Sequence, residues 1–141
     1  MKAALCEHPD DPARSDLMRR VRQSGTKPEQ EVAAALRELG IRFRQNVRTL
    51  PGSPDFANKS RRWALFVHGC FWHRHRNCVR ATTPTRNRRF WLDKFGANEK
   101  RDRRNTRELR SIGFQVITVW ECQTLDTPRL LRRLARVLER N

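Results

Sequence analysis

The feature that most constrains this chain is the apolar run RRWALFVHG, residues 61–69, which leads directly into CFWHRHRNC, residues 70–78. The run has the length of a strand and is bounded by arginines and a glycine, which is typical of a central strand in a sheet. Residues 66–78 hold three of the chain's four histidines and two of its four cysteines. A structural metal site, a catalytic cluster and a surface that inserts into a partner are the three interpretations of this segment.

The rest of the chain predicts elements in the order α-β-β-β-α-β-α. Thr26 and Glu29 have capping-box spacing and Gly40 closes the segment, so we expect a helix over residues 26–40. Strands are expected over 41–47, around 55–57, over 61–69 and over 114–122, the last finishing at Cys122. Two further helices are expected over 90–113, broken near Gly96, and over 127–141. This order predicts an α/β fold with a mixed sheet flanked by helices.

The length and charge of the chain limit its organisation and its partners. At 141 residues without an internal repeat, we expect a flexible segment over 1–17 and a single domain over 18–141. The 31 Lys and Arg residues against 15 Asp and Glu give a net charge of +16, which favours a polyanion, nucleic acid first, as partner. A ribosome-like filler protein, a basic membrane-surface protein and an arginine-rich base composition are the alternatives. No apolar run approaches the roughly 20 residues of a membrane span, and the N-terminus lacks the apolar core of a secretory signal, so we expect a cytoplasmic protein, nucleoid-associated when bound to DNA.

The cysteines form the first candidate site. Cys70, Cys78 and Cys122 with His75 offer three thiolates and an imidazole, which suit a structural tetrahedral zinc ion. A reducing compartment favours metal ligation over disulfides. Spacing alone does not decide between His75 and His73 as the imidazole ligand. A reactive thiol and an incidental trio of buried cysteines are the alternatives to a metal site.

Asp55 and the remaining histidines form the second candidate site. If the strand that follows Pro54 pairs with the central strand, Asp55 lies at the same sheet edge as His68. Mg²⁺ takes oxygen ligands, so one carboxylate with a main-chain carbonyl can suffice; a turn position for Asp55 is the alternative. His68 and His73, if they do not bind zinc, suit proton transfer near neutral pH, with phosphate contact as the alternative.

The aromatic pair Phe71 and Trp72 lies between the proposed zinc ligands. A bound metal would hold both rings on a rigid loop, and bulky side chains that enter base steps unstack and kink duplex DNA. Core packing is the other interpretation of these rings.

Four segments, LPGSPDF, FVHGCFWHRHRNC, FWLDKFGANEKRDRR and VITVWEC, in this order and at these separations, resemble the very-short-patch-repair (Vsr) mismatch endonucleases over residues 18–122. The resemblance implies a restriction-endonuclease-like fold of the PD-(D/E)XK type with a structural zinc site. It implies Mg²⁺-dependent nicking of one DNA strand 5′ to the thymine of a T:G mismatch made by deamination of 5-methylcytosine. The implied partner is double-stranded DNA with that mismatch, bound by a monomer and followed by downstream repair proteins.

The resemblance also implies roles for individual residues. Asp55 would bind Mg²⁺ together with the main-chain carbonyl of Val67. The proton-transfer and water-ordering network would comprise His68 and His73, supported by Glu29 and Asp102. Zinc would be bound by Cys70, His75, Cys78 and Cys122. The DNA contacts would come from the wedge residues Phe71, Trp72 and Met18 and from the helix residues Trp91, Lys94 and Asn98.

The chain departs from the family pattern at one point. Two residues separate His75 from Cys78, where the family more often has one, and an extra loop residue can bulge without moving the sulfur. A catalytically reduced, zinc-stabilised DNA-binding protein and a structure-selective nuclease of the same fold are the alternative functions. Binding alone does not require the residues of the proposed catalytic network, so their joint presence argues against it: Asp55, His68, His73, Glu29 and Asp102.

Overall fold

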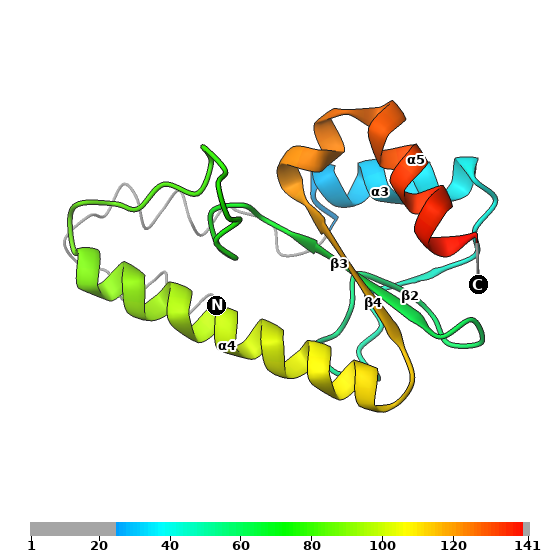
Figure 1. Ribbon diagram of the computed structural model, residues 1–141, viewed down its shortest axis with the longest axis horizontal. Coiled ribbons are helices and arrows are strands. Elements are labelled where there is room, and N and C mark those ends of the chain that lie inside the picture. Colours follow the sequence, from blue (N-terminus) through cyan, green and yellow to red (C-terminus); the bar gives the residue numbers. More distant parts are fainter. Residues whose placement is uncertain (1–24, 140–141) are drawn as a thin grey trace.

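The computed structural model describes residues 25–139, so the expected flexible segment 1–17 and the candidate wedge residue Met18 lie outside the described residues. The elements are α3 (Lys27–Glu38), β1 (Arg44–Gln45), β2 (Phe56–Asn58), β3 (Trp63–His68), α4 (Arg88–Ser111), β4 (Gln115–Trp120), the 3₁₀ helix η1 (Glu121–Leu125) and α5 (Thr127–Leu138) (Figure 1). The predicted α-β-β-β-α-β-α order is therefore confirmed. No helix within residues 25–139 has the length and apolar character needed to cross a membrane.

The four strands form one mixed sheet in the order β1-β2-β3-β4. The pairs β1–β2 and β2–β3 are antiparallel, and β3–β4 is parallel. A parallel pair needs a long crossover, which α4 supplies. Because His68 pairs with Trp120, the C-terminal ends of β3 and β4 meet at one edge of the sheet, where both candidate sites begin.

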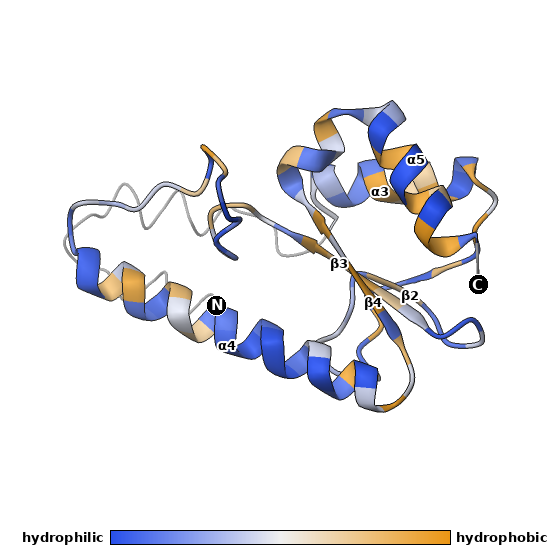
Figure 2. Ribbon diagram, in the orientation of Figure 1, coloured by the Kyte–Doolittle hydropathy of each residue, from blue (hydrophilic) through white to orange (hydrophobic). Residues whose placement is uncertain are grey.

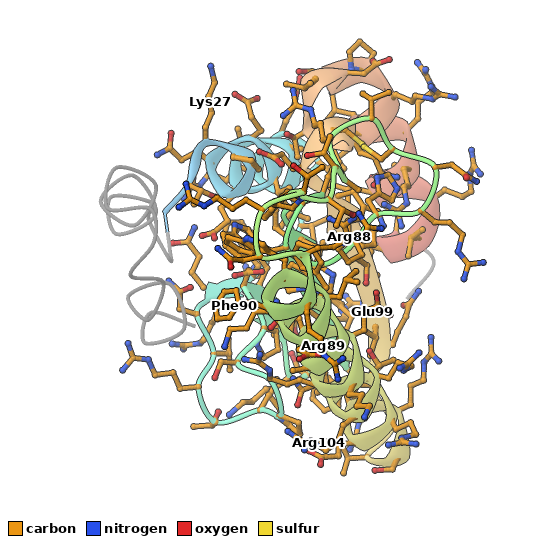
Figure 3. The ribbon with its side chains drawn as sticks, turned by 90° about the vertical axis from the view of Figure 1, so that its left-hand side faces the viewer. Lys27, Arg88, Arg89, Phe90, Glu99 and Arg104 are labelled. Carbon is orange, nitrogen blue, oxygen red and sulfur yellow. The ribbon has the colours of Figure 1, made fainter. Side chains whose placement is uncertain are left out.

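Two hydrophobic cores lie on opposite faces of the sheet. Helices α3 and α5 cover one face and α4 covers the other (Figure 1). The larger core, under α3 and α5, includes Leu36, Leu65, Val119 and Leu134. The smaller core, under the C-terminal part of α4, includes Ala64 and Leu109. Figure 2 shows that α4 is mostly hydrophilic along its length, and Figure 3 shows charged side chains such as Arg104 projecting from it. One sheet face thus supplies most of the apolar burial, while the other carries polar groups.

The first helix begins as predicted, with one difference in the cap. The hydroxyl of Thr26 accepts a hydrogen bond from the Glu29 N–H at 3.4 Å. The Glu29 carboxylate accepts from the Gly25 N–H at 2.8 Å, one residue before the usual partner in a capping box. The Glu29 carboxylate is therefore fixed at the N-terminus of α3.

Three expected element boundaries are wrong. Helix α4 runs through Gly96 without a break. One glycine inside a helix costs only about 1 kcal/mol relative to alanine, and the hydrogen bonds of the neighbouring helical turns offset this cost. The first strand is reduced to Arg44–Gln45, because Asn46 takes a left-handed conformation with φ 51° and ends it. The last strand ends at Trp120, whose N–H donates to the Gln123 side-chain oxygen at 2.9 Å, so Cys122 lies in η1 instead of a strand.

Candidate active site and metal centre

Two groups of ligand-type side chains lie at the C-terminal edge of β3 and β4. In each group the candidate ligand atoms all lie within 4.8 Å of one another. The first group is Cys70, His75, Cys78 and Cys122, and the second is His68, His73 and Asp102. The turn that follows β3 thus divides its histidines between two sites of different chemistry.

The cysteine group has the donor set and spacing of a closed zinc site. The Nδ1 atom of His75 lies 3.7 Å from the Cys70 sulfur and 3.4 Å from the Cys122 sulfur. Tetrahedral zinc with bonds of about 2.3 Å separates its ligands by about 3.8 Å, so these residues fit the metal. Burial raises the pKa of the Cys70 thiol to about 12, so a cation is needed to hold its thiolate at neutral pH. The geometry selects His75 over His73 as the imidazole of this group.

The extra residue between His75 and Cys78 does not move the sulfur out of the group. Arg74 and Asn77 both take left-handed backbone conformations, with φ 57° and 58°. Asparagine tolerates this conformation better than most residues, so the loop turns sharply twice and returns Cys78 to the other ligands. The insertion is absorbed in the loop.

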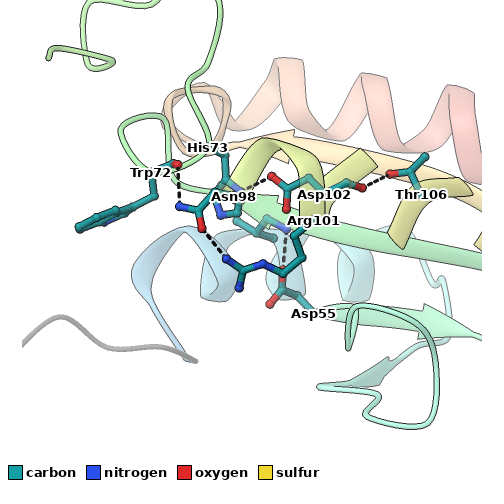
Figure 4. Close-up of polar contacts among 8 residues, drawn as sticks. Asp55, Trp72, His73, Asn98, Arg101, Asp102 and Thr106 are labelled. Atoms are coloured by element: carbon teal, nitrogen blue, oxygen red, sulfur yellow. Dashed lines mark hydrogen bonds and ion pairs between the residues drawn. The ribbon is translucent and has the colours of Figure 1, made fainter. Parts of the chain in front are cut away.

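The second group forms a paired imidazole arrangement. His73 Nδ1 lies 2.6 Å from a carboxylate oxygen of Asp102 in α4 (Figure 4). An ionised carboxylate only accepts, so Nδ1 carries the shared hydrogen and Nε2 is the remaining nitrogen of His73. The His68 and His73 rings stack with centroids 3.9 Å apart and planes within 6°. Burial, followed by the nearby His73, lowers the pKa of His68 to about 4, which keeps that ring neutral at physiological pH.

Asp55 is fixed against β3. Its carboxylate accepts from the Val67 N–H at 2.7 Å, a bond made possible by the antiparallel pairing of β2 and β3. Burial raises the pKa of Asp55 to about 6 against the opposing effect of that bond; the charge of Glu29 raises the pKa further, and His73 lowers it. The charges of Glu29 and His73 therefore both act on the Asp55 carboxylate. A carboxylate oxygen is the kind of ligand that a hard cation such as Mg²⁺ takes.

Comparison with known proteins gives the family of the chain. The family described as DNA mismatch endonuclease Vsr matches residues 7–80. DNA mismatch endonuclease Vsr of Escherichia coli is 41% identical over 113 residues, covering 80% of this chain and 72% of the relative. The chain belongs to the Vsr family. Type II nicking enzyme V.XorIIP of Xanthomonas oryzae is 42% identical over 123 residues, 87% of this chain and 90% of the relative. Type II nicking enzyme V.NmeAIP of Neisseria meningitidis is 38% identical over 125 residues, 89% of each chain.

In this Vsr-family chain, the aromatic pair Phe71 and Trp72, the predicted DNA wedge, packs against aromatic side chains of α4. Phe71 packs against Trp91 and Phe95 of α4 with centroids 5.9 and 5.2 Å apart, and Trp72 packs against Trp91 at 5.8 Å. Trp91 and Phe95 are each 3% exposed, while Phe71 and Trp72 are half-buried. Phe71 and Trp72 therefore pack in part against α4, as the core-packing interpretation expects, and each keeps part of its surface exposed.

Asn98 and Trp91 are less accessible than a base-contacting role requires. Asn98 is 2% exposed; its amide donates to the Trp72 carbonyl at 3.2 Å, and its side-chain oxygen accepts from Arg101 (Figure 4). Lys94 is half-buried on the same helix. In this conformation Asn98 positions the backbone of the wedge, and contact of Trp91 or Asn98 with DNA bases requires the loop to move. Their predicted role in DNA binding stays a prediction.

Sequence reasoning missed Arg74, whose guanidinium holds several groups of this loop together. Its guanidinium donates to the carbonyls of Phe71, Thr82 and Ala81 at 3.2, 2.8 and 2.9 Å, and to the Thr83 hydroxyl at 2.8 Å. It also lies 4.1 Å from the centroid of the Phe95 ring. In a chain with 31 basic residues, nothing in the pattern distinguishes this arginine from its neighbours.

Proposed function

We propose that this chain is an Mg²⁺-dependent DNA endonuclease that nicks one strand 5′ to the T of a T:G mismatch, the product of 5-methylcytosine deamination, in very short patch repair. The observation that carries the proposal is that the Asp55 carboxylate is held on β3 by the Val67 N–H, one residue before His68, whose ring stacks on His73 at the end of the same strand. Membership of the Vsr family supports it, as do the names of the relatives, one a mismatch endonuclease and others nicking enzymes. We further propose that residues 18–141 act as one domain, as a monomer on DNA in the cytoplasm.

The proposed metal ligands are the Asp55 carboxylate and the Val67 carbonyl oxygen. A Mg²⁺ ion held by these two groups would supply stabilisation of negative charge on the phosphate oxygens. The Val67 N–H holds one Asp55 oxygen toward the strand and limits rotation of the carboxylate. The chain thereby orients its own ligand before any substrate is bound.

His73 is the proposed proton acceptor. Asp102 fixes its tautomer and leaves Nε2 as the nitrogen that takes a proton from the attacking water, as in other carboxylate-histidine pairs. The neutral His68 ring, stacked on His73, is available to hydrogen-bond the phosphate or the leaving oxygen. Glu29, fixed in the cap of α3, adds negative charge near Asp55 and so favours a bound cation.

Zinc is the proposed structural cofactor. Bound to Cys70, His75, Cys78 and Cys122, it would join the loop after β3 to η1, because Cys122 is the only one of the four that lies outside that loop. Phe71 and Trp72 would then be held between two zinc ligands, Cys70 and His75, and could insert into the duplex beside the mismatch. This arrangement gives the two metals separate functions.

A strand-resolved cleavage assay tests the function. Duplexes of one sequence carrying a T:G mismatch, the matched pair or another mismatch are incubated with protein and Mg²⁺, with each strand labelled in turn. We expect one nick, 5′ to the mismatched T. Equal cutting of every duplex would instead support the structure-selective nuclease, and binding without cutting would support the DNA-binding protein.

A further inference from the structure

A basic groove lies along β1, outside the residues assigned to either metal. It has a volume of about 1040 Å³ and is lined by residues 41–45, 47–49 and 57–60. Its cationic side chains are Arg42, Arg44, Arg48 and Lys59. All four are exposed, and among the described lining residues none is acidic. Within residues 25–139, none of these four side chains forms an ion pair, so their positive charges are not neutralised by a described carboxylate.

The segment that lines the groove is hydrogen-bonded to the backbone at Asp55, the residue that carries the proposed catalytic carboxylate. The Asn46 N–H donates to the main-chain carbonyl of Asp55 at 2.9 Å, and the Val47 N–H donates to the Pro54 carbonyl at 3.0 Å. In Figure 4 the strand that starts beside Asp55 runs away from the Trp72 side chain. The groove follows this strand to Asn58, so the aromatic wedge and the groove lie on opposite sides of Asp55.

A second arginine-rich hollow, over η1 and α5, differs in chemistry. Its volume is about 650 Å³, and Asp126 contributes a carboxylate to its lining. The guanidinium of Arg133 is already used there, because it donates to the Gln123 side chain at 3.0 Å and to the Thr118 carbonyl at 2.8 Å. Arg133 therefore stabilises the edge of β4. The exposed arginines of this hollow provide a control in which the same number of positive charges is removed away from the groove.

We propose that the groove along β1 is a phosphate track for the arm of duplex DNA that leaves Asp55 on the side away from the wedge. The placement of a scissile phosphate at Asp55 rests on the proposed function; the anion-binding character of the groove does not. Arginine forks bind phosphate oxygens in pairs, and three of the four cations are arginines. Phosphate contacts carry no sequence information, so the groove contributes equally to matched and mismatched duplexes.

The first experiment compares two triple variants with the same change in net charge. The groove variant is Arg42→Gln, Arg44→Gln and Arg48→Gln, and the control is Arg129→Gln, Arg132→Gln and Arg136→Gln on α5. All six side chains are exposed. Duplex affinity is measured against salt concentration with Ca²⁺ in place of Mg²⁺. Since each phosphate contact contributes about 0.9 to the slope of log K against log salt, we expect the groove variant to lose about 2 to 3 from the magnitude of that slope and the control less than 1.

The second experiment tests which arm of the duplex the groove binds, with wild type and the groove variant side by side. The duplex is shortened by about one helical turn, ~10 base pairs, on one side of the mismatch and then on the other. We expect wild-type affinity to fall when one particular arm is removed, and the groove variant to be insensitive to that arm. Equal slopes for the two triple variants, or equal arm sensitivity of wild type and groove variant, would overturn the phosphate track. These readouts measure binding alone, so a failure to nick T:G duplexes leaves them unaffected and counts only against the proposed function.

Discussion

His73 and Asp102, 29 positions apart in the sequence, are joined by a 2.6 Å contact between Nδ1 and a carboxylate oxygen. The contact connects the loop after β3 to the middle of α4, on the polar face of the sheet. It gives His73 a defined tautomer.

Asp102→Asn should reduce the single-turnover nicking rate about 10- to 100-fold with little change in duplex affinity. The asparagine amide can donate to Nδ1 and thereby move the hydrogen to Nε2, which removes the proton acceptor. Asp93→Asn, an exposed carboxylate on the same helix, is the matched control. Equal rates for Asp102→Asn and wild type would refute the role of the pair.

Asp55→Asn should abolish nicking while duplex binding in a mobility-shift assay is kept, because the amide cannot supply the charge that holds Mg²⁺. Asp55→Ala should do the same, at the cost of an unpaired Val67 N–H. Nicking by either variant at more than about 1% of the wild-type rate would count against Asp55 as the metal ligand.

Asp55→Asn should also stabilise the Mg²⁺-free protein at neutral and alkaline pH. Burial raises the pKa of Asp55 from 3.8 to about 6, so ionisation costs the folded state stability. The wild-type contribution is fully present below pH 4 and is lost as pH rises through 6. The gain from Asn should therefore be about 1–3 kcal/mol at pH 8 and near zero at pH 4, measured by urea unfolding without Mg²⁺. A gain that is the same at both pH values would contradict this explanation.

Cys122→Ala should lower the zinc content from one per chain toward zero and lower the melting temperature. Cys122 is the ligand that ties the loop to η1, and metal affinity couples to folding. Cys6→Ala, which changes the remaining cysteine of the chain, is the control for zinc content by elemental analysis. Wild-type protein without zinc would remove the proposed site.

Arg74→Lys should keep one zinc per chain and yet weaken discrimination between T:G and matched duplexes about tenfold. Lysine keeps the charge but cannot make the four hydrogen bonds of the guanidinium, so the aromatic pair loses its fixed position. Fluorescence of 2-aminopurine beside the mismatch reports insertion directly. Arg76→Lys, an exposed arginine of the same loop, should behave as wild type.

Much of the fold could be predicted from local pattern. Apolar periodicity and caps identified α3, β3 and α5, because burial of one face and satisfaction of helix ends are decided by neighbouring residues. The ends of the strands were harder to predict from the sequence. A left-handed residue at Asn46 and the side chain of Gln123 end two strands, and neither effect has a periodic signature.

The sequence by itself determined the chemistry of this protein: which residues can bind zinc, which carboxylate precedes the strand beside the histidines, and which charge the surface carries. Only the tertiary structure decided which histidine, His75 or His73, joins the cysteine group. It also paired Asp102 with His73 and placed the Arg74 guanidinium where it holds the loop after β3 together. The physical reason is that residue type fixes what a group can bind, while pairing across a sheet and onto a helix fixes which groups come within a few ångströms of one another.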